Sequence, residues 1–106
     1  MTRVEELQMI SFDIILHSGS SRTLVHEAFE AMREGRYTFA EQKLEEANQE
    51  ILLAHHAQTA LLQDYASGHN VPVDVIMLHA QDHLMTTMTL REVALEMLEL
   101  YKYVKP

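Results

Sequence analysis

The sequence predicts an all-α protein, an antiparallel bundle of three helices that run up, down and up. Glycine and proline, which interrupt helices, are rare, with three and two copies in 106 residues. Apolar residues recur at the spacing of one helix face, and the strict alternation that is typical of strands is absent at useful length. A chain of this length has the common size of one domain, so we expect residues 1–106 to form a single domain.

The first predicted helix spans Val4 to about Glu34. Thr2 and Glu5 have the spacing of a capping box, in which side chains satisfy the free amides of the first turn. Gly35 marks the end of this helix. Gly19 lies inside the helix next to serines, where it costs about 1 kcal/mol relative to alanine, and it indicates either a kink or a close approach of another segment.

The second predicted helix spans about Thr38 to Ala66. Thr38 and Glu41 repeat the spacing of the first start signal, and Gly68 follows the final turn. Between these signals the apolar residues keep approximate helical spacing. They are Phe39, Leu44, Ala47, Ile51, Ala54, Leu61, Leu62 and Tyr65.

The third predicted helix extends from a cap at Asp74 to Tyr103, because Pro72 prevents a helix from crossing the preceding link. Placing its residues at about 100° per step gives two apolar faces instead of one. A lone three-helix bundle buries only one face well, so the second face predicts either an oligomer interface or a broad core. The first face consists of Met77, Leu84, Met88, Leu95 and Leu98, and the second consists of Val75, Leu78, Met85, Val93, Met97 and Leu100, together with His79, Asp82, Thr86 and Thr89.

The charge balance argues against nucleic acids and anionic membranes as partners. Sixteen acidic residues against eight Lys and Arg give a net charge of -8, which repels phosphates and favours a basic protein partner. The chain has no cysteine, its N-terminus lacks the apolar region of a secretory signal, and no apolar run approaches the roughly 20 residues of a membrane span. We therefore expect a cytoplasmic protein without direct membrane insertion.

Two of the seven histidines stand out by their spacing. His79, Asp82 and His83 lie at i, i+3 and i+4, so their side chains project from one side of a helix. The histidine pair also has the spacing of a zinc site, although Ala80 follows His79 where the metalloprotease motif has glutamate. The sequence contains neither the serine-hydrolase elbow nor a nucleotide-phosphate loop, which argues against a serine hydrolase and against direct use of a nucleotide. Two interpretations of the histidine pair are therefore left, metal binding and phosphorylation of a histidine by a donor protein.

Four stretches spread over nearly the whole chain form a specific, collinear pattern. They are I-L-H-S-G-S-S-R from Ile15 to Arg22, L-A-H-H-A-Q-T-A-L from Leu53 to Leu61, A-S-G from Ala66 to Gly68, and V-I-M-L-H-A-Q-D-H-L-M-T from Val75 to Thr86. With these stretches the sequence resembles the lactose/cellobiose-specific IIA components of the phosphoenolpyruvate-dependent sugar phosphotransferase system.

The resemblance implies a phosphotransferase component that assembles as a homotrimer of three-helix bundles. It implies that phospho-HPr gives a phosphoryl group to His79, which passes it to a cysteine of the cognate IIB during uptake of a lactose-, cellobiose- or chitobiose-type disaccharide. Asp82 matches an aspartate that meets its two symmetry mates at the trimer axis and shares a divalent cation, usually Mg²⁺. Gln81 and His83 match positions beside the active histidine, and we expect them to have supporting roles.

Two other functions stay open on the residues alone. A non-catalytic module would hold zinc through the histidine pair or scaffold a partner through its acidic surface. A regulatory module would keep the same fold and report the state of phosphorylation instead of feeding transport. Zinc that is lost when His79 or His83 is replaced would indicate the metal-binding module, whereas a phosphorylated adduct that depends on HPr would indicate the relay.

Overall fold

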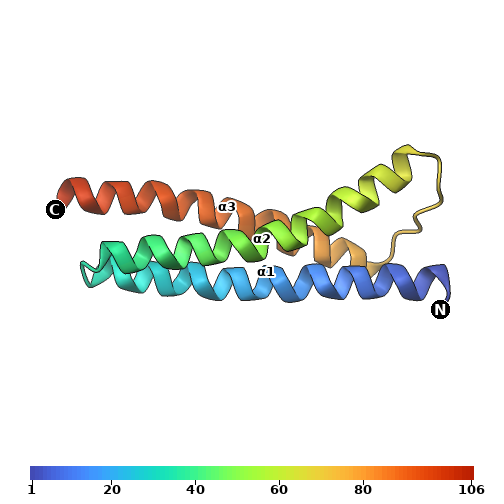
Figure 1. Ribbon diagram of the computed structural model, residues 1–106, viewed down its shortest axis with the longest axis horizontal. Helices are drawn as coiled ribbons and strands as arrows, with labels where there is room; N and C mark the ends of the chain where they lie inside the picture. The colour runs from blue at the N-terminus through green and yellow to red at the C-terminus, as the bar shows by residue number, and fades with distance from the viewer.

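The computed structural model describes residues 1–106 and contains three long helices and no strand. Helix α1 comprises Arg3–Arg33, α2 comprises Tyr37–Ala66 and α3 comprises Val75–Val104. Consecutive helices run in opposite directions, and the two termini lie at opposite ends of an elongated bundle of 53 × 22 × 19 Å (Figure 1). The predicted up-down-up bundle is confirmed, and no predicted helix boundary is displaced by more than about one residue, within the usual uncertainty of helix ends. None of the three helices combines the length and the apolar character that a membrane span requires.

Side chains cap the beginnings of α1 and α3 as the sequence predicts. The Thr2 hydroxyl accepts a hydrogen bond from the backbone amide of Glu5 at 3.2 Å. The Asp74 carboxylate accepts one from the backbone amide of Met77 at 2.9 Å. Each cap satisfies an amide that has no partner within its own helix, which fixes where these two helices begin.

A glycine turn between α1 and α2 determines where α2 begins. Gly35 has a φ of 75°, its amide donates to the Met32 carbonyl at 3.1 Å, and the Arg36 amide donates to the Ala31 carbonyl at 2.9 Å. These two bonds form the Schellman closure of a helix C-terminus. The start signal predicted at Thr38 is wrong, because Arg36 directly after this turn is already the N-cap of α2 and makes no side-chain capping hydrogen bond.

A narrow polar layer divides the core into two apolar clusters, one toward the α1–α2 turn and one toward the α2–α3 loop. Three fully buried polar residues form this layer, namely Ser18, Ser21 and Thr87. The Ser21 hydroxyl donates to the Ala47 carbonyl of α2 at 2.9 Å, and the Thr87 hydroxyl accepts from Arg22 of α1. The layer therefore joins α1 to both other helices at one level of the bundle.

The two apolar faces predicted for α3 have different surroundings. The first face is mostly buried: Met77, Leu84 and Leu98 lie in the core and Met88 is half-buried, although Leu95 is exposed. The second face is exposed apart from half-buried Met97, and it includes Val75, Leu78, Met85, Val93 and Leu100. The alternative of a broad core is therefore wrong. An exposed apolar row of this length is typical of an interaction surface.

Replacing Gly35 with alanine is expected to lower the free energy of unfolding by about 1 kcal/mol, because an L-residue is strained at positive φ. Gly19→Ala is the matched control. Gly19 has ordinary helical backbone, and an added Cβ would lie 3.7 Å from His83 Nε2, an unstrained contact. Alanine at this position should therefore raise the free energy of unfolding by up to about 1 kcal/mol. Urea denaturation measures both changes, and equal stabilities of Gly35→Ala and the unsubstituted protein would contradict the left-handed turn.

Candidate functional site

The four residues predicted for the site lie near the N-terminal end of α3. His79 and Asp82 are exposed, and Gln81 and His83 are half-buried. The imidazole rings of His79 and His83 are stacked, with ring centroids 5.8 Å apart and planes inclined by 9°. The structure therefore brings the predicted nucleophile into contact with the predicted second imidazole, and it leaves the nucleophile as the more accessible of the two.

His83 lies where α3 packs against α1. A Cβ on Gly19 would be 3.7 Å from His83 Nε2, so the backbone of α1 runs close beside this ring. The close approach predicted at Gly19 is confirmed, and α1 continues through it as one helix. Burial lowers the pKa of His83 from its ordinary value of 6.5, the positive charges of Arg22 and His79 lower it further, and Asp82 acts in the opposite direction. These effects on the pKa favour the neutral form of His83, which has one ring N–H available to donate.

Gln81 is connected to α2. The side-chain amide of Gln58 donates to the side-chain oxygen of Gln81 and lies 3.7 Å from the sulfur of Met85. This bond uses the oxygen of Gln81 and leaves its amide hydrogens free to donate to another group. The supporting role assigned to Gln81 stays a prediction.

Arg22 of α1 belongs to the same region, although the sequence alone indicated no role for it. Its Nη2 donates to the Thr86 hydroxyl of α3 at 2.8 Å, and its Nε donates to the Thr87 hydroxyl at 3.3 Å. A signal was present, because Arg22 lies one helical turn after Gly19 in the I-L-H-S-G-S-S-R stretch. Its partners could not be inferred, because they depend on how α1 and α3 are aligned and not on spacing within one helix.

Asp82 has no companions for metal binding within its own chain. No group of three or more His, Asp or Glu side chains in the chain could hold a metal ion. A carboxylate oxygen is a suitable Mg²⁺ ligand, but Mg²⁺ has octahedral coordination, of which one carboxylate supplies only a small part. A cation that binds through Asp82 therefore needs further ligands besides this carboxylate, and a zinc site at His79 and His83 would also need further ligands.

An apolar groove of about 300 Å³ lies where the beginning of α3 packs against α2, whereas the ring of His83 faces α1. The groove lies between the C-terminal part of α2, the α2–α3 loop and the first turns of α3, and Leu78 and Gln81 on either side of His79 belong to its lining. Leu62, Tyr65 and Leu78 in the same lining are 63%, 71% and 60% exposed. Exposed apolar surface of this kind is typical of a site where another protein docks.

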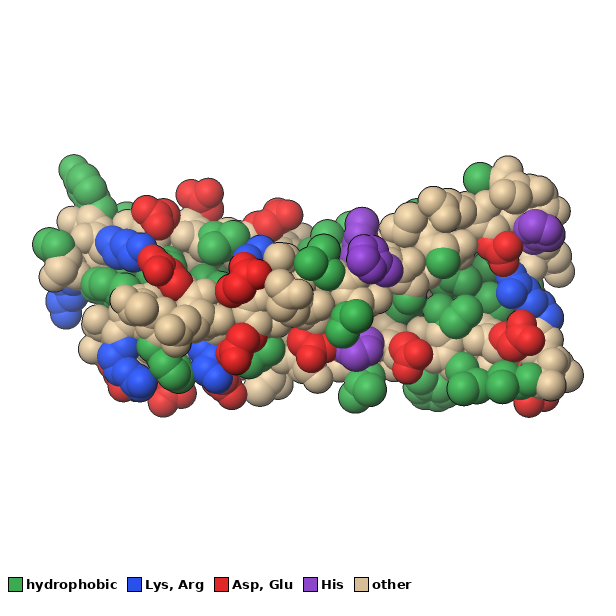
Figure 2. All heavy atoms as spheres, in the orientation of Figure 1, with side chains coloured by type: hydrophobic (Ala, Val, Ile, Leu, Met, Phe, Trp, Pro, Cys, Tyr) green, Lys and Arg blue, Asp and Glu red, His purple; other side chains and the backbone are tan.

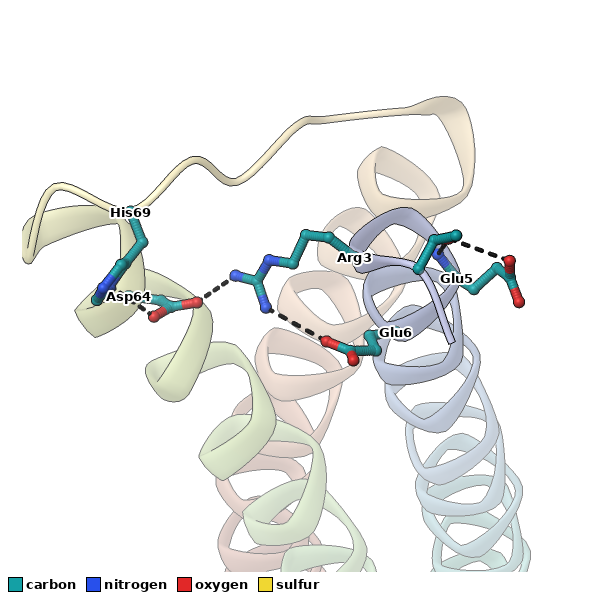
Figure 3. Close-up of polar contacts among 6 residues, drawn as sticks. Arg3, Glu5, Glu6, Asp64 and His69 are labelled. Carbon is teal, nitrogen blue, oxygen red and sulfur yellow. Dashed lines mark hydrogen bonds and ion pairs between the residues drawn. The ribbon is translucent and has the colours of Figure 1, made fainter.

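Two other histidines, outside the site, form pairs with carboxylates of α2. His69 Nδ1 in the α2–α3 loop lies 3.0 Å from Asp64 of α2, and Asp64 also pairs with Arg3 at the start of α1 (Figure 3). His17 Nδ1 of α1 lies 2.6 Å from a carboxylate oxygen of Glu50 in α2. The exposed pair of His69 contributes on the order of 0.5 kcal/mol, and the half-buried pair of His17 joins α1 to α2, so both histidines have structural roles.

Comparison with known proteins identifies the family. The family described as "PTS system, Lactose/Cellobiose specific IIA subunit" matches residues 9–102. The lichenan-specific phosphotransferase enzyme IIA component of Bacillus subtilis is 44% identical over 98 residues, which cover 92% of this chain and 89% of that relative. The chain therefore belongs to the lactose/cellobiose-specific IIA subunits of the phosphotransferase system.

Solved structures share the three-helix fold. PtcA from S. mutans superposes with a TM-score of 0.93 at 68% identity and covers 96% of this chain and 99% of its own. The IIA(Chitobiose) subunit of the Escherichia coli phosphotransferase system, solved in complex with HPr, superposes with a TM-score of 0.80 at 31% identity and covers 94% and 97%. The resemblance seen in the sequence is confirmed, and the chain is a phosphotransferase component with a phosphoryl-carrier role in sugar uptake.

His83 is expected to titrate below pH 6.5 when its ring resonances are followed by NMR as a function of pH. Arg22→Gln removes a positive charge that disfavours the imidazolium, so it should raise the pKa of His83 toward 6.5. Because the pKa of His83 is lower in the folded state than in the unfolded state, the unfolded state binds a proton more readily as pH falls. The free energy of unfolding is therefore unaffected by His83 above about pH 6.5 and decreases as pH falls from there through the folded-state pKa. A His83 pKa at or above 6.5 would contradict the placement of its ring against α1.

Proposed function

We propose that His79 accepts a phosphoryl group from phosphorylated HPr and passes it to the cognate IIB during uptake of a disaccharide. The observation that supports this proposal most directly is the exposed imidazole of His79 stacked on the half-buried, neutral imidazole of His83. A neutral imidazole attacks phosphorus with the lone pair of one nitrogen while the other nitrogen keeps its proton, so no base is needed. The bond from phosphorus to the donor breaks as the bond to His79 forms, and the reverse exchange delivers the group to IIB.

Gln81 and His83 are the proposed supporting residues. Enzymatic phosphoryl transfer depends mainly on positioning and on stabilising the charge of the phosphoryl oxygens. The ring N–H of neutral His83 and the amide hydrogens of Gln81 are hydrogen-bond donors close to His79 in the chain. Since Gln58 fixes the oxygen of Gln81, the amide of Gln81 is oriented before any partner binds.

Charge and apolar surface together favour a protein donor such as HPr. The chain carries a net charge of -8, and acidic side chains are spread along the face shown in Figure 2. This charge favours encounter with a basic partner, and the exposed apolar groove between α2 and the beginning of α3 offers that partner a surface to dock on. The E. coli IIA(Chitobiose) relative has been solved in complex with HPr. We place the protein in the cytoplasm, where these exchanges with HPr and IIB occur.

We also propose that the working form is a homotrimer in which the exposed second face of α3 lines the symmetry axis. Asp82 lies within this row, between Leu78 and Met85. Threefold symmetry would therefore bring three copies of its carboxylate together among apolar side chains. Like charges in such a place must be neutralised by a cation with oxygen ligands or by protonation, and we propose Mg²⁺ as the cation.

Incubation with phosphoenolpyruvate, enzyme I and HPr is expected to add one phosphoryl group per chain, and His79→Ala should abolish this addition. His83→Ala should still be phosphorylated, about 10- to 100-fold more slowly, because one hydrogen-bond donor to the transferring group is lost. His56→Ala is the matched control, since it removes another exposed helical histidine and should behave like the unsubstituted protein. Intact-mass spectrometry over time measures all four proteins. An acid-labile phosphoryl group on His79→Ala would refute the assignment.

Removal of divalent cations at alkaline pH is expected to weaken the trimer, because the three Asp82 carboxylates would then be ionised without a counter-ion. Asp82→Asn keeps the shape of the side chain and removes its charge, so its trimer should be indifferent to chelator. Sedimentation velocity of both proteins, with Mg²⁺ and with EDTA, measures the effect. Identical behaviour of the two proteins in every condition would place Asp82 away from the axis.

A further inference from the structure

Arg22 joins α1 to the part of α3 that directly follows His83. Its Nη2 donates to the Thr86 hydroxyl at 2.8 Å, and its Nε and Nη2 lie 3.3 and 3.2 Å from the Thr87 hydroxyl. Arg22 is half-buried, and Thr87 is fully buried in the polar layer of the core. A guanidinium group presents its N–H donors in a rigid planar fork, so it can hold both hydroxyls at once.

The Thr86 hydroxyl transmits this contact to the backbone of the site. It accepts from Arg22, and its own hydrogen is within reach of the Asp82 carbonyl at 2.9 Å and of the His83 carbonyl at 3.2 Å. A hydroxyl carries one hydrogen and donates to one acceptor at a time, for which the shorter distance favours Asp82. A continuous path of hydrogen bonds thus runs from α1 to the turn of α3 that carries Asp82 and His83.

The same turn carries the ring that stacks on His79. The ring of His83 contacts α1 at Gly19, and the backbone of its turn is connected to α1 at Arg22, one helical turn further along. A rotation of α3 about its own axis would break both connections and would separate His83 from its place beside α1. The two contacts therefore determine how α3 presents its histidine pair.

We propose that Arg22 is a positioning residue for phosphoryl transfer at His79. Its fork holds α3 in a fixed rotation on α1, which keeps the His83 ring where its N–H can serve the phosphoryl oxygens. The proposal rests on the proposed function of His79, and it predicts that Arg22 acts through His83. Lysine would preserve the positive charge, but its single nitrogen cannot reproduce the planar fork that spans Thr86 and Thr87.

The first measurement is the single-turnover transfer of phosphoryl from phospho-HPr to Arg22→Lys over a range of HPr concentrations. The rate constant at saturation is expected to fall about tenfold, because a small displacement of a positioned group slows transfer strongly. The HPr concentration at half-saturation should stay within about twofold, because the docking surface is unchanged. Thr86→Val, which removes the connecting hydroxyl and leaves Arg22 in place, should reproduce the loss even if Arg22→Lys does not fold. Because Thr86 belongs to the second face of α3, sedimentation velocity checks that this variant assembles like the unsubstituted protein.

Arg91→Lys is the matched control. Arg91 Nε donates to the Leu44 carbonyl at 2.8 Å and so joins α3 to α2 further from the histidine pair. If Arg22 merely stabilised the bundle, both lysine variants would lose melting temperature and transfer rate together. We expect similar changes in melting temperature for the two variants, with a slower transfer rate only for Arg22→Lys.

A double-mutant cycle tests whether Arg22 acts through His83. In a His83→Ala background, Arg22→Lys should cause no further loss of rate, because the ring that it positions is absent. The proposal is overturned if Arg22→Lys lowers the rate constant in the His83→Ala background as much as it does in the unsubstituted protein. It is also overturned if the rate constant is unchanged in Arg22→Lys and Thr86→Val, or if these variants change only the HPr concentration at half-saturation. None of these outcomes contradicts the proposed function, which is tested separately by the phosphorylation of the unsubstituted protein and of His79→Ala.

Discussion

The close contact between α1 and α3 at Gly19 sets the geometry of the candidate site. Gly19 has no side chain, and the ring of His83 lies close to the backbone of α1 at this position. This contact removes part of the ring from water, which favours its neutral form, and it supports the stacked arrangement with exposed His79. The partial burial of the His83 ring thus follows from the contact with α1, and His79, one turn earlier in α3, remains exposed.

Helix α3 separates two tasks between its faces. One face, which includes Met77 and Leu84, completes the core, and the other presents an apolar row interrupted by Asp82. The histidine pair lies on the α1 side of this row, and the groove that contains Leu78 lies on its α2 side. A small protein can in this way build its core, an assembly surface and a reactive group from one helix, because three directions around a helix are available to three partners.

Local signals in the sequence predicted the helices and the histidine pair, but they could not predict which residues of different helices are in contact. Asp74 and Gly35 act within one turn of their own positions, and the spacing of His79 and His83 alone places both on one side of α3. The error at Thr38 arose because the turn that closes α1, and not a side-chain cap, decides where α2 begins. The contact of Arg22 with α3 joins residues more than 60 positions apart, so it depends on helix packing that spacing does not encode.

The central claim is that His79 is the reactive member of a pair in which His83 has a supporting role. Nitrogen–phosphorus correlation NMR of the phosphorylated protein, labelled with ¹⁵N in its histidine rings, tests this claim directly. The account predicts coupling of phosphorus to one ring nitrogen of His79, and a shift without coupling for the ring of His83. Coupling of phosphorus to His83, or to any other histidine in place of His79, would contradict it.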